Sequence, residues 1–254
     1  MQEELKSEGK CLFCGEMIPQ AEIFKHLSAH LKENTKTGKP GLSFLIKVGL
    51  PKKWGKTPLF LSLWVDGEAT LKIVDTFLRD IWLDCCGHMS AFSLPKKKSS
   101  KKLDSNSLAH LVDEDSEFPG EISMSKKAKD VFSKGLELVY EYDFGSTTEL
   151  GVCVEGEFPV KADQKIVLLS RNEPLKIICN ICKKEPATQI CTACMYDKDS
   201  AFCDKCAKKH AKTCEDFEDY ASMPIVNSPR MGVCGYTGGT IDIERDTYKA
   251  PKPQ

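Results

Sequence analysis

Thirteen cysteines in a chain of 254 residues constrain the fold more than any other feature of this sequence. Most of them occur in pairs with two residues between them, the spacing written Cys-x2-Cys. The first ten residues are rich in charge and lead into no apolar segment of the secretory kind, so the sequence predicts a cytoplasmic protein. Cytosolic thiols are kept reduced, and paired cysteines there indicate metal ligands rather than disulfides. Zinc is the metal that this spacing predicts first.

The rest of the composition is that of an ordinary globular protein. Lys and Arg number 36 and Asp and Glu 37, which gives a formal net charge of -1. Proteins that bind nucleic acid or membrane surfaces usually carry an excess of positive charge, so such a role would have to rest on a local patch. The longest apolar run is also far shorter than the roughly 18–20 residues that a membrane helix needs, so no membrane association is expected.

Candidate ligands for one ion stand near the start of the chain. Cys11 and Cys14 are followed, after eleven residues, by His26 and His30. Two thiolates on a tight turn and two histidines four apart on one helix face supply the four ligands of a tetrahedral zinc ion. The sequence therefore predicts a small zinc module over residues 1–34.

The residues between these ligands fit such a module. Pro19 is expected to open the helix, and Ile18, Ile23 and Leu27 are expected to form a miniature core. The pattern resembles the two-Cys, two-His zinc finger family, with a spacer one residue shorter than usual. The side chains at that family's base-contact positions are poor donors to base edges: Pro19, Glu22 and Lys25. A structural or protein-binding finger is at least as well supported as a DNA reader.

A second set of ligands fills residues 176–217, where large apolar residues are scarce and metal must replace the missing core. Its members are Cys179, Cys182, Cys191, Cys194, Cys203, Cys206, His210 and Cys214. Eight ligands complete two tetrahedral sites, so with the finger we expect three zinc ions. The spacing alone leaves open whether consecutive pairs close sequential sites or alternate pairs close interleaved ones.

The order of these ligands resembles the cross-brace modules of the B-box and MYND type. That resemblance implies interleaved sites, and it also implies a protein partner, since both families chiefly serve protein recognition. One ion would be held by Cys179, Cys182, Cys203 and Cys206, and the other by Cys191, Cys194, His210 and Cys214.

Hydrophobic periodicity predicts an α+β domain over residues 43–172. The expected helices are Ala69 to Leu83 and Ala128 to Lys134, and the expected strands are Leu42 to Val48, Leu59 to Trp64, Met89 to Leu94, Glu137 to Phe144, Glu149 to Glu155 and Lys165 to Leu169. Lys32 to Gly41 is predicted to be a linker, and a Lys/Ser-rich insertion at about 95–118 to be weakly ordered. The turn-rich tail, 218–254, is expected to fold back on the middle domain. The predicted architecture is a small mixed sheet with a packed helix, flanked by two zinc-stabilised modules.

Two stretches of this middle domain resemble the plasmid pRiA4b ORF-3-like family, also labelled a transposon-passenger TnpR family. They are the Tyr-Glu-Tyr-Asp-Phe-Gly segment within Leu138 to Gly145 and the segment from Trp82 to Phe92. The resemblance covers roughly residues 43–170, and Cys234-Gly235-Tyr236 echoes a later Cys-Gly motif. It implies a strand-strand-helix-strand opening and a fold rather than a reaction.

The middle domain also holds the one alternative to a structural role. Cys85, Cys86 and His88 follow the predicted helix and could form a reactive or metal cluster, but the sequence offers no evident fourth ligand. Cysteines at a helix end are more often small buried hydrophobes, and Cys153 and Cys234 are interpreted in the same way. Asp143 suits a turn that its carboxylate caps.

The sequence therefore predicts a non-enzymatic zinc protein that acts as a protein- or nucleic-acid-interaction module. The alternative is an enzyme or a small-ligand-binding protein with a site near Cys85, Cys86, His88 and Asp143. Nucleic-acid binding would use the finger together with exposed lysines, namely Lys52, Lys53, Lys56 and the run from Lys96 to Lys102.

Overall fold

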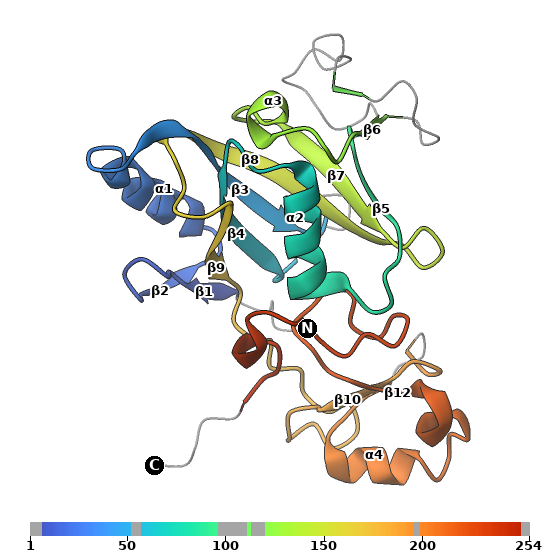
Figure 1. Cartoon of the computed structure of the whole chain (residues 1–254). Coiled ribbons are helices and arrows are strands. Elements are labelled where there is room, and N and C mark those ends of the chain that lie inside the picture. Colours follow the sequence, from blue (N-terminus) through green and yellow to red (C-terminus); the bar gives the residue numbers. More distant parts are fainter. Residues whose placement is uncertain (1–6, 52–56, 96–110, 113–119, 196–198, 250–254) are drawn as a thin grey trace. The chain divides into compact units, whose positions relative to one another are not determined.

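The computed structural model describes residues 7–51, 57–95, 111–112, 120–195 and 199–249, and Figure 1 shows their arrangement into elements. The chain divides into two compact units. Unit 1 comprises residues 1–78 and 88–173, and unit 2 comprises residues 79–87 and 174–254. Within the described ranges, no helix has both the length and the apolar character that crossing a bilayer requires.

Unit 1 is built on a seven-stranded sheet in the order β6-β5-β7-β8-β3-β4-β9, and every pairing in it is antiparallel. The α+β class predicted from the sequence is confirmed. The sheet is larger than predicted and is antiparallel rather than mixed. Its strands are β3 (Pro40–Gly49), β4 (Phe60–Asp66), β5 (Ser90–Ser93), β6 (Glu121–Ile122), β7 (Glu137–Tyr142), β8 (Thr148–Val160) and β9 (Ile166–Arg171).

Both faces of this sheet are covered, because β4 is buried along its whole length. On one face lies α2 (Leu71–Leu78), whose fully buried Asp75 accepts hydrogen bonds from Tyr140 of β7 at 2.8 Å and Ser90 of β5 at 2.5 Å. The short α3 (Ala128–Val131) contacts β3. Side chains alternate along a strand, so Leu45 of β3 points to the face opposite that of its neighbour Phe44.

The predicted finger is part of this sheet unit rather than a separate miniature fold. It consists of the hairpin β1 (Glu8–Lys10) and β2 (Met17–Pro19), followed by α1 (Ile23–Asn34). The buried side chains of α1 join one hydrophobic cluster with strand residues, namely Ile23, Leu27 and Leu31 with Leu45, Phe60, Trp64, Phe158, Val160 and Leu169. The sheet therefore supplies most of the core that a free-standing finger would have to build alone.

Two local predictions for this region are wrong. Pro19 ends β2 instead of opening the helix, which begins at Ile23. The predicted linker from Lys32 to Gly41 is also shorter, because α1 continues to Asn34 and β3 begins at Pro40. Burial of Leu31 against the sheet extends the helix into that polar stretch. The Lys/Ser-rich insertion predicted at about 95–118 lies mostly outside the described residues.

The finger hairpin also lies along β9, the outer strand of the sheet. The backbone N–H of Leu12 donates to the Leu169 carbonyl at 2.9 Å, and that of Glu173 donates to the Glu8 carbonyl at 2.9 Å. Gly9 forms a bridge with Asn172 between them. A Cβ at Gly9 would lie 2.6 Å from the Arg171 carbonyl oxygen, so only glycine allows the two backbones to come this close.

Unit 2 is small and is held together by short elements. Its three-stranded antiparallel sheet has the order β11-β10-β12. The strands are β10 (Gln189–Cys191), β11 (Ala201–Phe202) and β12 (Ser222–Pro224), and the helical elements are the π-helical turns η2 (Arg79–Leu83) and η4 (Phe217–Ala221), α4 (Asp204–His210) and the short η5 (Ile243–Arg245).

The predicted helix from Ala69 to Leu83 continues through η2, which belongs to unit 2. The tail contacts this turn directly: Ser228 donates its hydroxyl to the Trp82 carbonyl at 2.6 Å, and the Thr240 N–H donates to the Asp80 carbonyl at 2.7 Å. Gly239 lies so close that a Cβ there would be 2.6 Å from the Ile81 carbonyl oxygen. Residues 79–87 and the tail therefore form one part of unit 2.

Candidate metal centres

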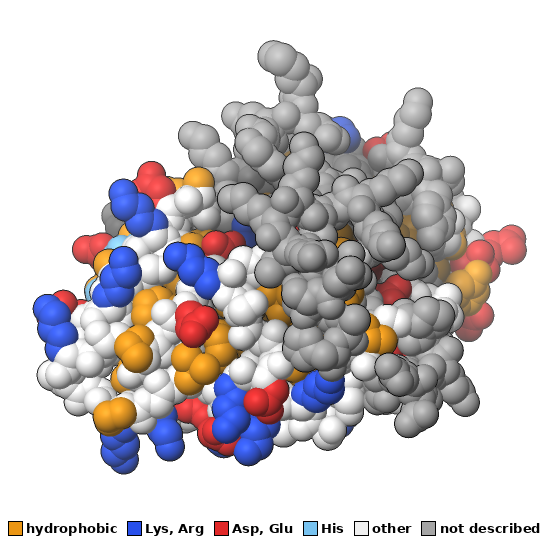
Figure 2. Space-filling model, turned by 90° about the horizontal axis from the view of Figure 1, so that it is seen from above, with side chains coloured by type: hydrophobic (Ala, Val, Ile, Leu, Met, Phe, Trp, Pro, Cys, Tyr) orange, Lys and Arg blue, Asp and Glu red, His pale blue; other side chains and the backbone are white. Residues whose placement is uncertain are grey.

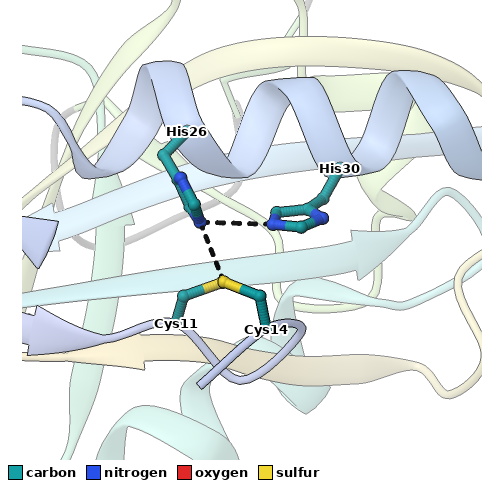
Figure 3. Close-up of side chains that lie close together, drawn as sticks. All are labelled: Cys11, Cys14, His26 and His30. Carbon is teal, nitrogen blue, oxygen red and sulfur yellow. Dashed lines mark hydrogen bonds between the residues drawn. The ribbon is translucent and has the colours of Figure 1, made fainter. Parts of the chain in front are cut away.

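Four candidate ligands of the finger converge from two elements of unit 1. Cys11 and Cys14 lie on the turn between β1 and β2, and His26 and His30 lie on α1. Figure 3 shows both imidazole rings pointing from α1 toward the thiols. All four ligand atoms lie within 4.8 Å of one another. The Nε2 atoms of the two histidines are 3.2 Å apart, and the Cys14 sulfur is 3.3 Å from His26 Nε2.

Local contacts hold this arrangement in place. The Cys11 N–H donates to the Glu16 carbonyl, and the Gly15 N–H donates to the Cys11 carbonyl, both at 2.8 Å. Gly15 has a φ of 81°, which closes the turn in a conformation that favours glycine. The Phe13 ring packs on His30 with centroids 5.2 Å apart. Burial raises the pKa of the Cys11 thiol, so ionising it in this position requires a nearby cation.

A tetrahedral zinc ion fixes the distances between its ligands. With bonds of about 2.3 Å to sulfur and about 2.0–2.1 Å to nitrogen, two sulfurs lie about 3.8 Å apart, two nitrogens about 3.3 Å, and a sulfur and a nitrogen about 3.6 Å. A disulfide would instead bring two sulfurs to about 2.05 Å. The nitrogen–nitrogen distance of 3.2 Å and the sulfur–nitrogen distance of 3.3 Å in the finger are close to those of a tetrahedral ligand shell.

Eight further candidate ligands form two groups in unit 2, each with its ligand atoms within 4.8 Å. The grouping is by alternate pairs: Cys179, Cys182, Cys203 and Cys206 in one, and Cys191, Cys194, His210 and Cys214 in the other. In the first group the sulfurs of Cys182 and Cys203 are 3.9 Å apart. In the second the sulfurs of Cys191 and Cys214 are also 3.9 Å apart. Both values match the edge of a tetrahedral ligand shell.

His210 is oriented by aromatic side chains. Its ring stacks on Phe202 with centroids 4.3 Å apart and meets Phe217 edge-on at 5.0 Å. These contacts direct Nε2 to a position 3.7 Å from the Cys194 sulfur. Cys206 and His210 lie four residues apart on α4 but belong to different groups, so this helix connects the two sites.

The electrostatics of the first group favour a bound cation. Burial opposes ionisation of Cys179, but backbone N–H groups of Cys182, Cys203 and Ile181 point at its sulfur and lower its pKa to about 6. Burial and the neighbouring thiols Cys203 and Cys179 raise the pKa of Cys206 to about 12. One thiol therefore ionises readily and its neighbour resists a second negative charge. A divalent ion removes that repulsion and lets the thiols coordinate together.

Three cysteines of unit 2 form a further group that the sequence did not predict as a set. The sulfurs of Cys85 and Cys86 are 3.6 Å apart, those of Cys86 and Cys234 are 3.8 Å apart, and all three lie within 4.8 Å. Among the described residues there are thus four groups that could bind metal, one more than the three predicted. Cys86 and Cys234 are exposed, so their interpretation as small buried hydrophobes is wrong.

The sequence reasoning missed Cys234 because it lies 148 residues from Cys86. A local signal was present nonetheless. Cys-Gly occurs at Cys14-Gly15, where the finger turns, and again at Cys86-Gly87 and Cys234-Gly235. All three glycines have positive φ, so the same backbone turn follows each cysteine.

The other residues of the enzyme alternative have structural contacts within unit 1. Asp143 has a φ of 64° and accepts hydrogen bonds from the N–H groups of Gly145 at 3.0 Å and Ser146 at 3.2 Å. Its predicted role as a turn cap is confirmed. His88 Nε2 lies 3.5 Å from the Asp143 carboxylate, and the His88 N–H donates to the Tyr142 hydroxyl at 3.3 Å. The two cysteines of that alternative belong to unit 2.

Comparisons with known proteins give little further information. No family model matches the chain, and no curated protein matches it. One solved structure that aligns is a protein of unknown function from Methanosarcina mazei Go1, with 18% sequence identity and a TM-score of 0.35. The alignment covers 51% of this chain and 67% of that one. A likeness at this level supports no conclusion about function.

Proposed function

We propose that this protein is a non-enzymatic zinc protein in which three structural ions stabilise the finger and the cross-brace module of residues 176–217. The observation that carries the proposal is that each of the three groups brings together four protein ligands. Catalytic zinc keeps one coordination position for water or substrate. Four protein ligands close a tetrahedral ion, so these groups suit a structural role.

The packing around the ligands supports the same role. Unit 2 has two small buried clusters: one combines ligand cysteines with Phe202, Phe217 and small alanines, and the other consists of Ala187, Ile190, Ala201, Met223 and Ile225. Clusters of this size bury too little apolar surface to fold residues 176–217 unaided, since small domains usually need metal or disulfide cross-links. The metal therefore acts as the centre of the core.

We further propose that the cross-brace module recognises a protein. Large apolar side chains are exposed in the module and directly after it, with Ile181 53% exposed and Tyr220 of η4 65% exposed. An open groove lies beside α4, lined by Lys208, Phe217 and Glu218 among others. Exposed aromatic and aliphatic side chains next to both signs of charge are typical of protein-binding surfaces. The order of its ligands, which resembles B-box and MYND modules, points the same way.

A protein partner is favoured over nucleic acid by the way the finger packs. The apolar face of α1 is used against the sheet, and Lys36, which follows the helix, pairs with Glu33 of its last turn at 2.8 Å. On the face shown in Figure 2, the described Lys and Arg side chains are interspersed with Asp and Glu and do not form one basic area. Residues 43–170 are proposed to share the pRiA4b ORF-3-like fold, which implies no nucleic-acid chemistry.

The zinc part of the proposal is tested on the full chain purified without added metal. Elemental analysis should find at least three zinc ions per chain. A strong chelator should then abolish the folded signal of residues 176–217 in amide hydrogen exchange. Fewer than three ions, or exchange that chelation leaves unchanged, would refute it.

The recognition part is tested with a photo-crosslinking amino acid in place of Tyr220, with Lys36 as the matched exposed position in unit 1. A discrete protein adduct should form at position 220, survive nuclease treatment and disappear in the Cys206→Ser background. An adduct that nuclease removes would favour nucleic acid. That alternative also predicts binding to random DNA or RNA that weakens steeply between about 50 and 200 mM salt.

A further inference from the structure

A group of cysteines outside the three predicted sites shares their geometry. Cys85 and Cys86 follow η2, and Cys234 lies in the tail, so all three belong to unit 2. Sulfur–sulfur distances of 3.6 Å and 3.8 Å separate Cys86 from its two neighbours. Both are close to the edge of about 3.8 Å expected for sulfurs around a tetrahedral zinc ion and far from the bond length of about 2.05 Å in a disulfide.

The backbone supports the same interpretation. In the turns that end at Cys14 and Cys182, the following residue has positive φ, with 81° at Gly15 and 56° at Lys183. This conformation turns the chain so that subsequent N–H groups face the thiolate, as those of Glu185 and Lys184 do at Cys182.

The same conformation follows the cysteines of the additional group. Gly87, after Cys86, has a φ of 75°, and Gly235, after Cys234, has a φ of 68°. Cys234 itself has a φ of 50°, which L-residues rarely adopt and which persists only where surrounding structure fixes it. In the other half of the group, the Gly87 N–H donates to Asp84 at 3.0 Å and closes the turn after Cys86.

The charges nearby also suit a metal thiolate centre. Arg230 is fully buried, and its guanidinium lies 3.6 Å from the Cys85 sulfur. Three thiolates and one divalent ion carry a net charge of -1, and the Arg230 cation compensates it.

From these observations we propose that Cys85, Cys86 and Cys234 hold a fourth metal ion of the thiolate-seeking class, represented by zinc. This site differs in character from the other three, because two of its cysteines are exposed to solvent. A tetrahedral ion needs one more ligand. His88 follows Cys86 by two residues in the sequence and is the nearest histidine along the chain.

The first test counts zinc in the full chain and in two variants. The wild type is expected to contain four equivalents, and the double variant Cys86→Ser/Cys234→Ser three, with an unchanged melting temperature for the rest of the chain. The matched control Cys153→Ser removes a cysteine outside all four groups and should keep four. A wild type with three equivalents, or a double variant that binds as many as the wild type, would overturn the fourth site and leave the three structural ions standing.

A second test uses only the wild type and does not depend on the variants folding. Thiol alkylation of the zinc-loaded protein is followed residue by residue with mass spectrometry. Cys234 is exposed and Cys153 is half-buried, so without a metal Cys234 should react at least as fast as Cys153. The fourth site predicts the reverse, with Cys153 modified at least about ten times faster. Equal or faster reaction at Cys234 would contradict the proposal.

Discussion

The finger of unit 1 and the cross-brace module of unit 2 use the same ligand chemistry but obtain their cores from different sources. In the finger, the buried side chains of α1 pack into a cluster that also contains Trp64 and Phe158 of the sheet. In the module, ligand cysteines make up half of the buried residues of the main cluster, and the second cluster of this unit is small and takes part of its members from after residue 217. A metal site next to a large core can be lost with limited damage, whereas a metal site that makes up the core cannot.

The largest effect is expected for Cys206→Ser in the module. The variant should lose zinc from the first group, and because α4 also carries His210, the second group should weaken as well. We expect residues 176–217 to unfold while the sheet unit stays folded, since structural zinc in small modules contributes about 10–16 kcal/mol. Amide hydrogen exchange resolved by peptide measures this directly. Amide protection that persists across residues 176–217 in this variant would show that the module, like the finger, does not need metal for its core.

The next effect is expected for Leu27→Ala in α1. Leu27 is fully buried between the helix and the sheet, so its truncation should cost about 2–5 kcal/mol of unfolding free energy in unit 1. Zinc content should remain unchanged, because the truncation removes none of the four ligands. Chemical denaturation monitored by Trp fluorescence gives the value. A loss below about 1 kcal/mol would mean that metal, not packing, anchors the helix.

A smaller effect is expected for Cys14→Ser, the counterpart in the finger of the module variant. Cys14 is exposed, and α1 retains its packing on the sheet, so the chain should lose one zinc equivalent but only about 1–3 kcal/mol of stability. Elemental analysis and thermal melting on the same sample provide both numbers. If protection of α1 disappears together with the metal, the two regions depend on zinc equally and the distinction fails.

The smallest effect is the pH dependence of zinc binding, which is measured on the wild-type chain. In the module the pKa of Cys179 is about 6 while those of Cys206 and Cys194 are about 12, so at neutral pH zinc must displace protons from the latter two. Protons therefore compete with the ion, and affinity should fall by about tenfold per unit of pH for each proton released. Zinc release from the module measured between about pH 8 and 5 tests this dependence, and release that does not vary with pH would contradict it.

The parts that the sequence predicted are those with local signatures. Spacing within residues 11–30 and 179–214 identified twelve candidate ligands, because knuckle turns and one-turn helix separations are properties of short segments. The division of the last eight into interleaved groups came from the resemblance to cross-brace modules. Alternating patterns located most strands to within a few residues, and Asp143 was recognised as a turn cap from its position before Gly145.

The parts that it did not predict depend on contacts between distant segments. An amphipathic α1 has the same pattern whether it packs on its own hairpin or on a sheet, so the role of Leu31 in the larger cluster had no local signature. The grouping of Cys86 with Cys234 likewise depends on a contact between residues 148 positions apart in the chain. A helix with a π-helical last turn, η2, also reads in sequence like any other helix end.

The hairpin that lies along β9 has a consequence for self-association. An uncovered outer strand offers a row of N–H and C=O groups to other chains, and such edges nucleate aggregation unless something blocks them. Here Gly9, Leu12 and Glu8 take up backbone positions along that strand. The finger thus covers this edge of the sheet. Displacing the finger would expose backbone groups of β9 to which a strand of another chain could add.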